Sequence, residues 1–177
     1  MPDYIVCPNV ISKEDCKEII SFAKNKWESG KIHVEGDLEK IRKSDVVWYS
    51  EKKHFELVER LISDVCNDTR VQWKVQVDSI ETMQITRYKV GQYYDFHIDG
   101  NGFDRMPVNN KARKISTSII LNDNFKGGEF EFLGLDRIEA KRGSAIVFPS
   151  WIPHRVKPVT KGIRYSLVAW VGGEPVT

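Results

Sequence analysis

Residues 93–100 read YYDFHIDG, and this stretch indicates both a strand and the chemistry placed on it. Aromatic and β-branched residues favour an extended segment, and Gly100 ends it. Side chains at positions i and i+2 of a strand point to the same face, so His97 and Asp99 project together while Ile98 points away. The two residues are therefore either a buried polar pair or two of the ligands of a metal site.

Similar segments continue along the chain on both sides of this strand. They are short, rich in Val, Ile, Thr and aromatic residues, and separated by turn signals such as VGQ, NFKGG, GLD and TKG. These segments cover residues 75–88, 93–99, 114–122, 128–134, 136–142, 144–150, 154–160 and 163–171. About eight strands with few helices between them predict a mainly β protein, an antiparallel barrel or a double-sheet jelly roll.

The first third of the chain has helical patterns instead. Ser12 is the expected N-cap of a helix, with Asp15 in a weak variant of the capping box and Gly30 as the expected end. A second helix is predicted over residues 53–67, after a short VVWY strand. We expect both helices to pack on one outer face of a sheet. The 177 residues predict a single domain over 1–177, with residues 1–75 as a helical support region and 76–173 as the β core.

Composition excludes several classes of protein. Apolar residues make up 41% and charged residues 29%, and the net charge of +2 is too small to indicate a nucleic-acid or membrane partner. No apolar run approaches the roughly 20 residues of a membrane-spanning helix, and the first residues lack the pattern of a signal peptide. Cys7, Cys16 and Cys66 form no CxxC pair and are expected to be inert packing residues. We therefore expect a cytoplasmic protein with free thiols.

His154 is the second histidine that could join the pair on the first strand. It lies in FPSWIPHRVKPV, far from Asp99 in sequence but easily adjacent to it across a double sheet. Two imidazoles and one carboxylate form the facial triad of non-haem iron(II) sites, which leaves coordination positions open for a cosubstrate and dioxygen. A structural zinc site would require a fourth ligand. The alternative is a hydrogen-bonded His-x-Asp pair without metal.

Arg164 follows His154 by ten residues, in KGIRYSLVAW. Alternation places Arg164 on one face of this strand with Ser166, Val168 and Trp170, and places Tyr165, Leu167 and Ala169 on the other face. An arginine that faces into a barrel is costly unless an anion meets it, and its planar guanidinium suits a carboxylate. An iron-chelating 2-oxo acid with a distal carboxylate would satisfy both ends of the site; an internal ion pair is the alternative.

At this point the chain resembles the iron(II)/2-oxoglutarate-dependent oxygenases of the prolyl 4-hydroxylase-like (PKHD-type) branch. The resemblance covers residues 84–171, through QITRYKVGQYYDFHID, STSIILND, GGEFEF, KRGSAIVFPSWIPHRVKPV and TKGIRYSLVAW. It implies a double-stranded β-helix, which is a cupin-like jelly roll with the N-terminal helices on one sheet. It also implies iron(II), 2-oxoglutarate and dioxygen, with ascorbate as a candidate additional cofactor.

The resemblance also implies roles for particular residues. His97, Asp99 and His154 would be the iron ligands, and Arg164 would hold the distal carboxylate of 2-oxoglutarate. The residues expected to line the cosubstrate pocket are Tyr88, Tyr94, Trp170 and either Ser118 or Ile120. For the three aromatic residues the alternative is simple barrel core. Gly127 and Gly128 are expected to serve a turn or bulge, and His33 and His54 are expected to face solvent.

The implied reaction couples decarboxylation of 2-oxoglutarate to succinate with hydroxylation of an aliphatic C–H bond. The expected substrate is a prolyl residue in a protein or peptide, in a groove formed by Tyr49, Tyr93, Trp151 and the loop 100–110. A free amino acid or other small metabolite is an alternative substrate, and a catalytically silent β-barrel that binds a partner is an alternative class. A nucleic-acid demethylase is disfavoured, because that family typically carries a second arginine where this chain has Trp170. The compact chain suggests a microbial cell or a virus-infected host cell as its location.

Overall fold

The structure is a computed structural model that describes residues 4–30, 41–68, 73, 75–106, 109–135 and 137–175. Its two described helices are α1 (Lys13–Phe22) and α3 (Lys52–Asn67). The strands of the first half are β1 (Ile5–Cys7), β2 (Glu28–Ser29), β3 (Arg42–Lys43), β4 (Asp45–Tyr49), β5 (Ser79–Ile80), β6 (Met83–Tyr88) and β7 (Tyr93–His97). Those of the second half are β8 (Ala112–Ile120), β9 (Phe125–Gly127), β10 (Phe130–Phe132), β11 (Arg137–Ile138), β12 (Ala145–Pro149), β13 (His154–Val156), β14 (Val159–Gly162) and β15 (Arg164–Gly173).

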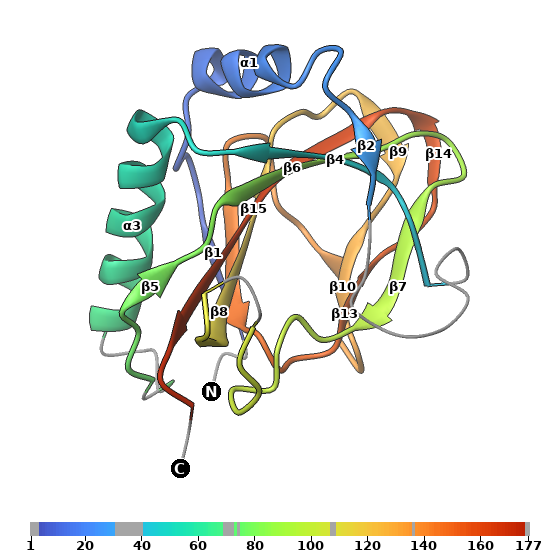
Figure 1. Cartoon of the computed structure of the whole chain (residues 1–177). Coiled ribbons are helices and arrows are strands. Elements are labelled where there is room, and N and C mark those ends of the chain that lie inside the picture. The colour runs from blue at the N-terminus through green and yellow to red at the C-terminus, as the bar shows by residue number, and fades with distance from the viewer. Residues whose placement is uncertain are drawn as a thin grey trace.

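Two antiparallel sheets face each other and form the predicted jelly roll (Figure 1). The large sheet has the order β1-β12-β8-β15-β6-β4-β2, with β5 added beside β15. The small sheet has the order β11-β10-β13-β7-β3, and β9 pairs with β14 in a separate ribbon. The chain passes repeatedly from one sheet to the other, so residues distant in sequence meet in the space between them.

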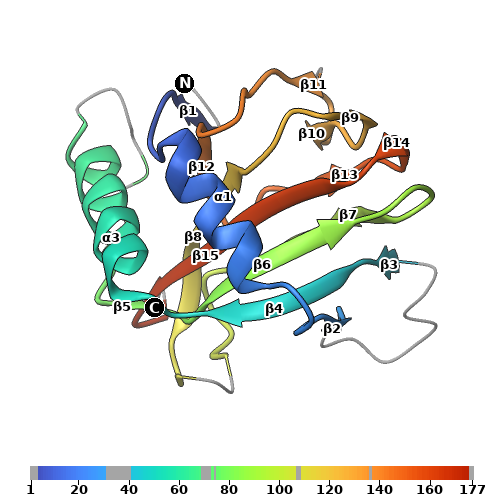
Figure 2. The ribbon, with the colours of Figure 1, turned by 90° about the horizontal axis from the view of Figure 1, so that it is seen from above.

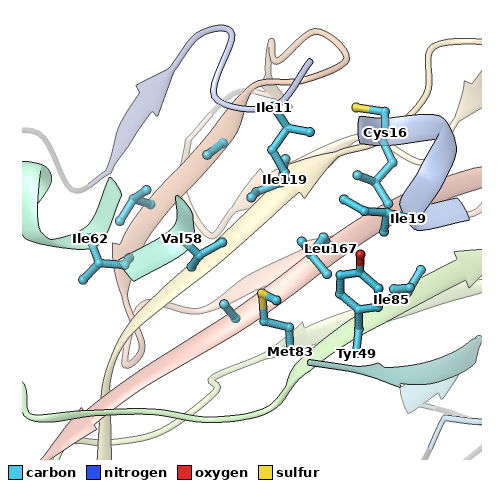
Figure 3. Packing of buried hydrophobic residues seen from close by; sticks show 14 of the residues in the cluster. Ile11, Cys16, Ile19, Tyr49, Val58, Ile62, Met83, Ile85, Ile119 and Leu167 are labelled. Carbon is cyan, nitrogen blue, oxygen red and sulfur yellow. The ribbon is translucent and has the colours of Figure 1, made fainter. Parts of the chain in front are cut away.

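The helices lie on the outer face of the large sheet, as predicted (Figure 2). Side chains from α1 and α3 pack there against alternate residues of the sheet strands (Figure 3). The residues of this core that Figure 3 labels are Ile11, Cys16, Ile19, Tyr49, Val58, Ile62, Met83, Ile85, Ile119 and Leu167. Neither described helix is long and apolar enough to cross a lipid bilayer.

A second, smaller core fills the space between the two sheets. Its buried members are Tyr88, Phe130, Phe132, Ile146, Phe148, Val156 and Val159. On β15 the expected alternation is confirmed, since Leu167 packs in the helix-facing core while Arg164 and Ser166 line the space between the sheets. The polar side chains of β15 therefore face the interior of the jelly roll.

The structure corrects several expectations for the first 75 residues. Ser12 caps α1, and its hydroxyl accepts a hydrogen bond from the backbone N–H of Asp15, but the helix ends at Phe22 rather than near Gly30. Asn25 adopts a left-handed conformation (φ 64°) that turns the chain away. This region also contributes strands to both sheets, since β1 and β4 pair in the large sheet and β3 pairs in the small sheet.

His54 does not face solvent, so that prediction was wrong; His33 lies outside the described residues. The His54 side chain is fully buried between α1, α3 and β4. Its Nδ1 lies 2.6 Å from the hydroxyl of Tyr49, and its Nε2 lies 3.3 Å from Oδ1 of Asp15. Asp15 also pairs with Lys53 and accepts a hydrogen bond from Ser12 (2.7 Å). This chain of polar groups ties the start of each helix to the sheet.

Substitution of Tyr49 by phenylalanine tests this connection. The change leaves the ring in place but removes the partner of a buried imidazole nitrogen, so the free energy of unfolding should fall by about 1–3 kcal/mol. Urea unfolding measures the change. Tyr165→Phe is the matched control, because its ring is only partly buried and no hydrogen bond of its hydroxyl is found in the described structure; equal losses in both variants would contradict the role given to His54.

Candidate functional site

The His-x-Asp motif lies at the end of β7, at the rim of the space between the sheets. The Nδ1–H of His97 donates to the backbone carbonyl of Asp95 (2.7 Å). In the neutral imidazole this bond leaves the lone pair on Nε2, which is the atom directed toward Asp99. The Nε2 of His97 lies 3.5 Å from Oδ1 of Asp99.

His154 enters the same site from the neighbouring strand of the small sheet. It opens β13 and is paired directly with His97 in the register between β13 and β7. Its Nδ1–H donates to the carbonyl of Ile152 (2.9 Å), and its Nε2 lies 3.6 Å from Oδ2 of Asp99. Burial lowers the pKa of His154 to about 4, so its ring is neutral near pH 7. The three predicted residues therefore converge, with both free ring nitrogens facing one carboxylate.

Asp99 remains an anion in this buried position. Burial alone would raise the pKa of Asp99, but the positive charge that the neighbouring His154 ring carries in acid outweighs burial, and the pKa lies well below its usual range. The backbone also holds the residue, because the N–H groups of Asp99 and Gly100 both donate to the carbonyl of Ser150 (2.9 and 3.2 Å). A neutral His154 ring beside a fixed carboxylate is the protonation state that metal binding requires.

The strand ends at His97, before Gly100, and a glycine is required at position 100 because another side chain occupies the space beside it. A Cβ at Gly100 would lie 2.7 Å from the Cβ of Arg113. Arg113 donates two hydrogen bonds to the carboxylate of Glu81 (2.7 and 2.5 Å), and its guanidinium lies 4.1 Å above the ring of Trp170. The sequence analysis missed Arg113 and Glu81, because a pairing across 32 residues leaves no local signal.

Arg164 is placed as predicted and has an unsatisfied donor. Its side chain is only 1% exposed and pairs in register with Tyr88 of β6. One guanidinium nitrogen donates to the hydroxyl of Ser166 (3.1 Å), whereas Nη2 is buried without a hydrogen-bond partner among the described residues. Burial lowers the pKa of this guanidinium, because no carboxylate of the described residues offsets its charge. An anion in the adjacent cavity would satisfy it.

The glycine pair before β10 shapes the wall behind Arg164. Gly127 and Gly128 both have positive φ angles (70° and 64°), as expected for a bulge. A Cβ at Gly128 would lie 2.9 Å from Cδ of Arg164 and 3.0 Å from Cγ2 of Val159. The absence of a side chain at Gly128 therefore provides the space for the methylene groups of Arg164.

Substitution of Gly128 by alanine should displace Arg164 and weaken 2-oxoglutarate binding by about tenfold, which corresponds to roughly 1.4 kcal/mol. Gly134→Ala is the matched control, because Gly134 has φ +81° and no atom lies within 4 Å of the position that its new methyl group would take. Both substitutions place alanine in an unfavourable left-handed backbone conformation, but only the methyl group of Gly128→Ala would contact Arg164. Calorimetric titration with 2-oxoglutarate separates them, and equal affinities in both would exclude the packing role.

A cavity of about 670 Å³ joins the three convergent residues to Arg164. Four of the predicted pocket residues line it: Tyr88, Tyr94, Ser118 and Trp170. The ring of Tyr94 stacks on that of His97, with 3.4 Å between centroids, and the indole N–H of Trp170 has no hydrogen-bond partner in the described structure. Ile120, the alternative to Ser118, is buried but does not line the cavity.

The predicted peptide groove is partly wrong. Tyr49 is 1% exposed and packs in the helix-facing core, whereas its neighbour Trp48 is half exposed and lines the cavity mouth. Alternation along β4 separates these two side chains, but it does not say which face is the cavity. Tyr93 and Trp151 lie outside the lining, while Asn101, Asp104 and Met106 of the predicted loop belong to it.

The site fits both groups that the sequence predicts. Two imidazole nitrogens and one carboxylate suit iron(II) and leave open positions. The buried, unpartnered donor of Arg164 in the same cavity suits the distal carboxylate of a chelating acid. A second cluster, formed by Asp15, Glu18 and His54, contains the ammonium group of Lys53 and is therefore unfavourable for a cation.

Comparison with known proteins agrees with this chemistry. The sequence model of the 2OG-Fe(II) oxygenase superfamily matches residues 83–172. A PKHD-type hydroxylase of Gloeothece citriformis is 37% identical over 105 residues, which are 56% of this chain and 46% of that protein. The chain thus spans about half the length of this relative.

Two solved structures share the fold. One is a viral collagen prolyl hydroxylase from Paramecium bursaria Chlorella virus-1 with 2-oxoglutarate, which has a TM-score of 0.75 and 22% identity and covers 96% of each chain. The other is a prolyl hydroxylase from Trichoplax adhaerens in complex with a peptide fragment of the hypoxia inducible factor. It also has a TM-score of 0.75, at 19% identity over 96% of this chain and 83% of that one. At these identities the similarity establishes the jelly-roll architecture.

Proposed function

This chain belongs to the 2OG-Fe(II) oxygenase superfamily, and we propose that it hydroxylates a prolyl residue of a protein or peptide. It is a 2-oxoglutarate-dependent dioxygenase that uses iron(II), 2-oxoglutarate and dioxygen. The observation that carries the proposal is the shared cavity that contains His97, Asp99 and His154 together with the unpartnered donor of Arg164. The names of the relatives and structural neighbours, which are prolyl and PKHD-type hydroxylases, support the choice of a prolyl substrate.

Each group of the chain has a defined task in this proposal. His97, Asp99 and His154 hold the iron, and the backbone carbonyls of Asp95 and Ile152 fix the ring orientations. Arg164 receives the distal carboxylate of 2-oxoglutarate, with Tyr88, Ser118 and Trp170 around it. The bound iron supplies the oxidising chemistry, by coupling decarboxylation of 2-oxoglutarate to insertion of one oxygen atom into a C–H bond. The buried walls around Arg164 keep water away from the cosubstrate.

The mouth of the cavity supports an extended substrate over a free amino acid. The lining includes residues with substantial solvent exposure, such as Trp48 at 50% and Ile98 at 47%. Because the cavity opens to the surface through such residues, it can admit one side chain of a peptide while the rest of the peptide extends outside in both directions. The carboxylates of Glu28 and Asp104 at this mouth are unfavourable for a nucleic-acid backbone.

We also propose a reducing compartment such as the cytoplasm, supported by three free cysteines. Ascorbate is the proposed reductant for maintaining ferrous iron during assay.

A peptide panel tests the proposed function. Purified protein with iron(II), 2-oxoglutarate and ascorbate is incubated with peptides that carry one central proline in varied sequence contexts, and mass spectrometry follows the gain of one oxygen. Matched peptides with alanine in place of proline are the control. Oxygen on proline in at least one context supports the proposal. Oxygen on a free amino acid alone, or on no compound while 2-oxoglutarate is bound, would favour the metabolite hydroxylase or the silent binding protein respectively.

A further inference from the structure

The cavity continues well beyond the metal-binding residues, across the inner face of the large sheet. The residues that line this part of the cavity are paired across neighbouring strands and form two rows. One row runs from Ser166 on β15 through Thr86 on β6 and Val46 on β4 to Glu28 on β2. A second row includes Ser118, Val168, Gln84 and Trp48. All these side chains line the cavity, which therefore reaches the edge of the sheet at β2.

Glu28 and Trp48 lie together at this outer end. Glu28 pairs directly with Val46, and Trp48 follows Val46 by two residues on the same strand. They are therefore diagonal neighbours on one face, about 7–8 Å apart, which long side chains bridge easily. Both line the cavity, and both are exposed to solvent.

Within the described residues, both side chains remain accessible to a ligand. Among the described parts of the chain, no hydrogen bond or ion pair engages the carboxylate of Glu28. Half of the surface of Trp48 is exposed, whereas the next residue of β4, Tyr49, is buried. A free carboxylate beside an exposed indole is the combination that binds an ammonium or guanidinium group, by charge pairing and by a cation–π contact.

The cations nearby are already engaged. Arg42 donates to the hydroxyl of Ser44 (2.8 Å) and to Oε1 of Gln84 (2.9 Å), and its guanidinium lies 4.7 Å from the Tyr94 ring. Arg113 is held by Glu81. Among the described residues at the cavity mouth, the carboxylates of Glu28 and Asp104 have no ionic partner, although the whole chain has a net charge of +2.

We propose that Glu28 and Trp48 form a subsite for a basic side chain of the substrate, so that the enzyme prefers peptides with lysine or arginine near the target proline. This inference rests on the proposed function and extends it to the substrate sequence. Three strand spacings of about 4.8 Å separate β15 from β2, and an extended chain covers that distance in roughly four residues. Because one cavity contains both the metal ligands and Glu28, the preferred basic residue is expected within about five residues of the proline.

The test compares peptides in which a single lysine or glutamate is scanned through five positions on each side of a central proline. Wild-type protein should favour one lysine position over the matched glutamate peptide by about five- to tenfold in kcat/KM. Glu28→Lys should reverse that preference, and Trp48→Ala should reduce it. Glu59→Lys, on the exposed face of α3, makes the same charge change away from the cavity and should keep the wild-type preference. Melting temperatures confirm that each variant is folded.

Binding is measured in parallel, by fluorescence anisotropy of labelled peptides with 2-oxoglutarate and manganese(II) in place of iron. One outcome is that peptides with lysine bind more tightly, that Glu28→Lys reverses this preference, and that no oxygen is found on proline. This outcome supports the subsite and contradicts the proposal of a prolyl substrate. Oxygen on proline with equal rates for lysine and glutamate peptides overturns the subsite and keeps the proposed function. Neither binding nor oxygen for any peptide overturns both.

Discussion

Replacement of Asp99 by alanine is expected to lower 2-oxoglutarate turnover by more than about 1000-fold. Asp99 is the anion among the three convergent residues, and its two oxygens lie 3.5 and 3.6 Å from the free nitrogens of His97 and His154. Without it, two neutral imidazoles remain and no ligand offsets the charge of a divalent ion. Affinity for iron(II), measured by calorimetry without oxygen, should fall by at least about 100-fold.

The fold should survive this change. The side chain of Asp99 projects into the cavity and supports no packing layer, so the free energy of unfolding of the metal-free protein should change by no more than about 1 kcal/mol. Asp123→Ala removes an exposed carboxylate far from the site and is the matched control. Full turnover in Asp99→Ala, or equal losses of activity in both variants, would contradict the role of Asp99 as a ligand.

Substitution of Arg164 by methionine is expected to reduce affinity for 2-oxoglutarate by about 2–4 kcal/mol, which is roughly 30- to 900-fold. The loss arises because the guanidinium is the buried cation with an unsatisfied donor in the cavity. Methionine has a similar stem and leaves the packing against Gly128 in place. Arg164→Lys should retain part of the affinity, because an ammonium group pairs with a carboxylate as a point charge.

Thermal unfolding distinguishes this role from a structural one. Removal of an uncompensated buried charge should leave the protein without 2-oxoglutarate equally stable or more stable. With metal present, 2-oxoglutarate at 100 times the wild-type Kd should raise the Tm of the wild-type protein by about 5–10 °C and that of Arg164→Met by no more than about 3 °C. Arg155→Met, which removes a guanidinium held by Glu131 and the Phe96 ring, should behave as wild type. An unchanged ligand-induced shift in Arg164→Met would show that the carboxylate binds elsewhere.

The convergence of the candidate metal ligands was partly predictable, because local rules orient most of these side chains. The i and i+2 spacing of His97 and Asp99 predicted that they project together, although β7 ends at His97 and Asp99 is held in a bend by the carbonyl of Ser150. Alternation along β15 fixes the direction of Arg164. His154 required more, since only the jelly-roll pairing of β13 with β7 brings it opposite His97. The proximity of these four residues can be predicted once the strands are assigned to two facing sheets.

Errors arose where a distant partner decides the environment of a residue. His54 is buried because Tyr49 and Asp15 satisfy its two nitrogens, and Asp15 is 39 residues away. Tyr49 was placed in the groove because alternation along β4 separates two faces without indicating which of them lines the cavity. The pairing of Arg113 with Glu81, which supports Trp170 and Gly100, likewise depends on tertiary contacts that no local pattern encodes.

The most direct test of the central claim measures 2-oxoglutarate consumption and peptide oxidation in the same reaction, under isotopically labelled dioxygen and with the best peptide of the panel. The account predicts one succinate formed for each peptide oxidised, one labelled oxygen atom on the proline, and loss of both products in Asp99→Ala. Peptide oxidation without equimolar succinate, or undiminished products in Asp99→Ala, would contradict it.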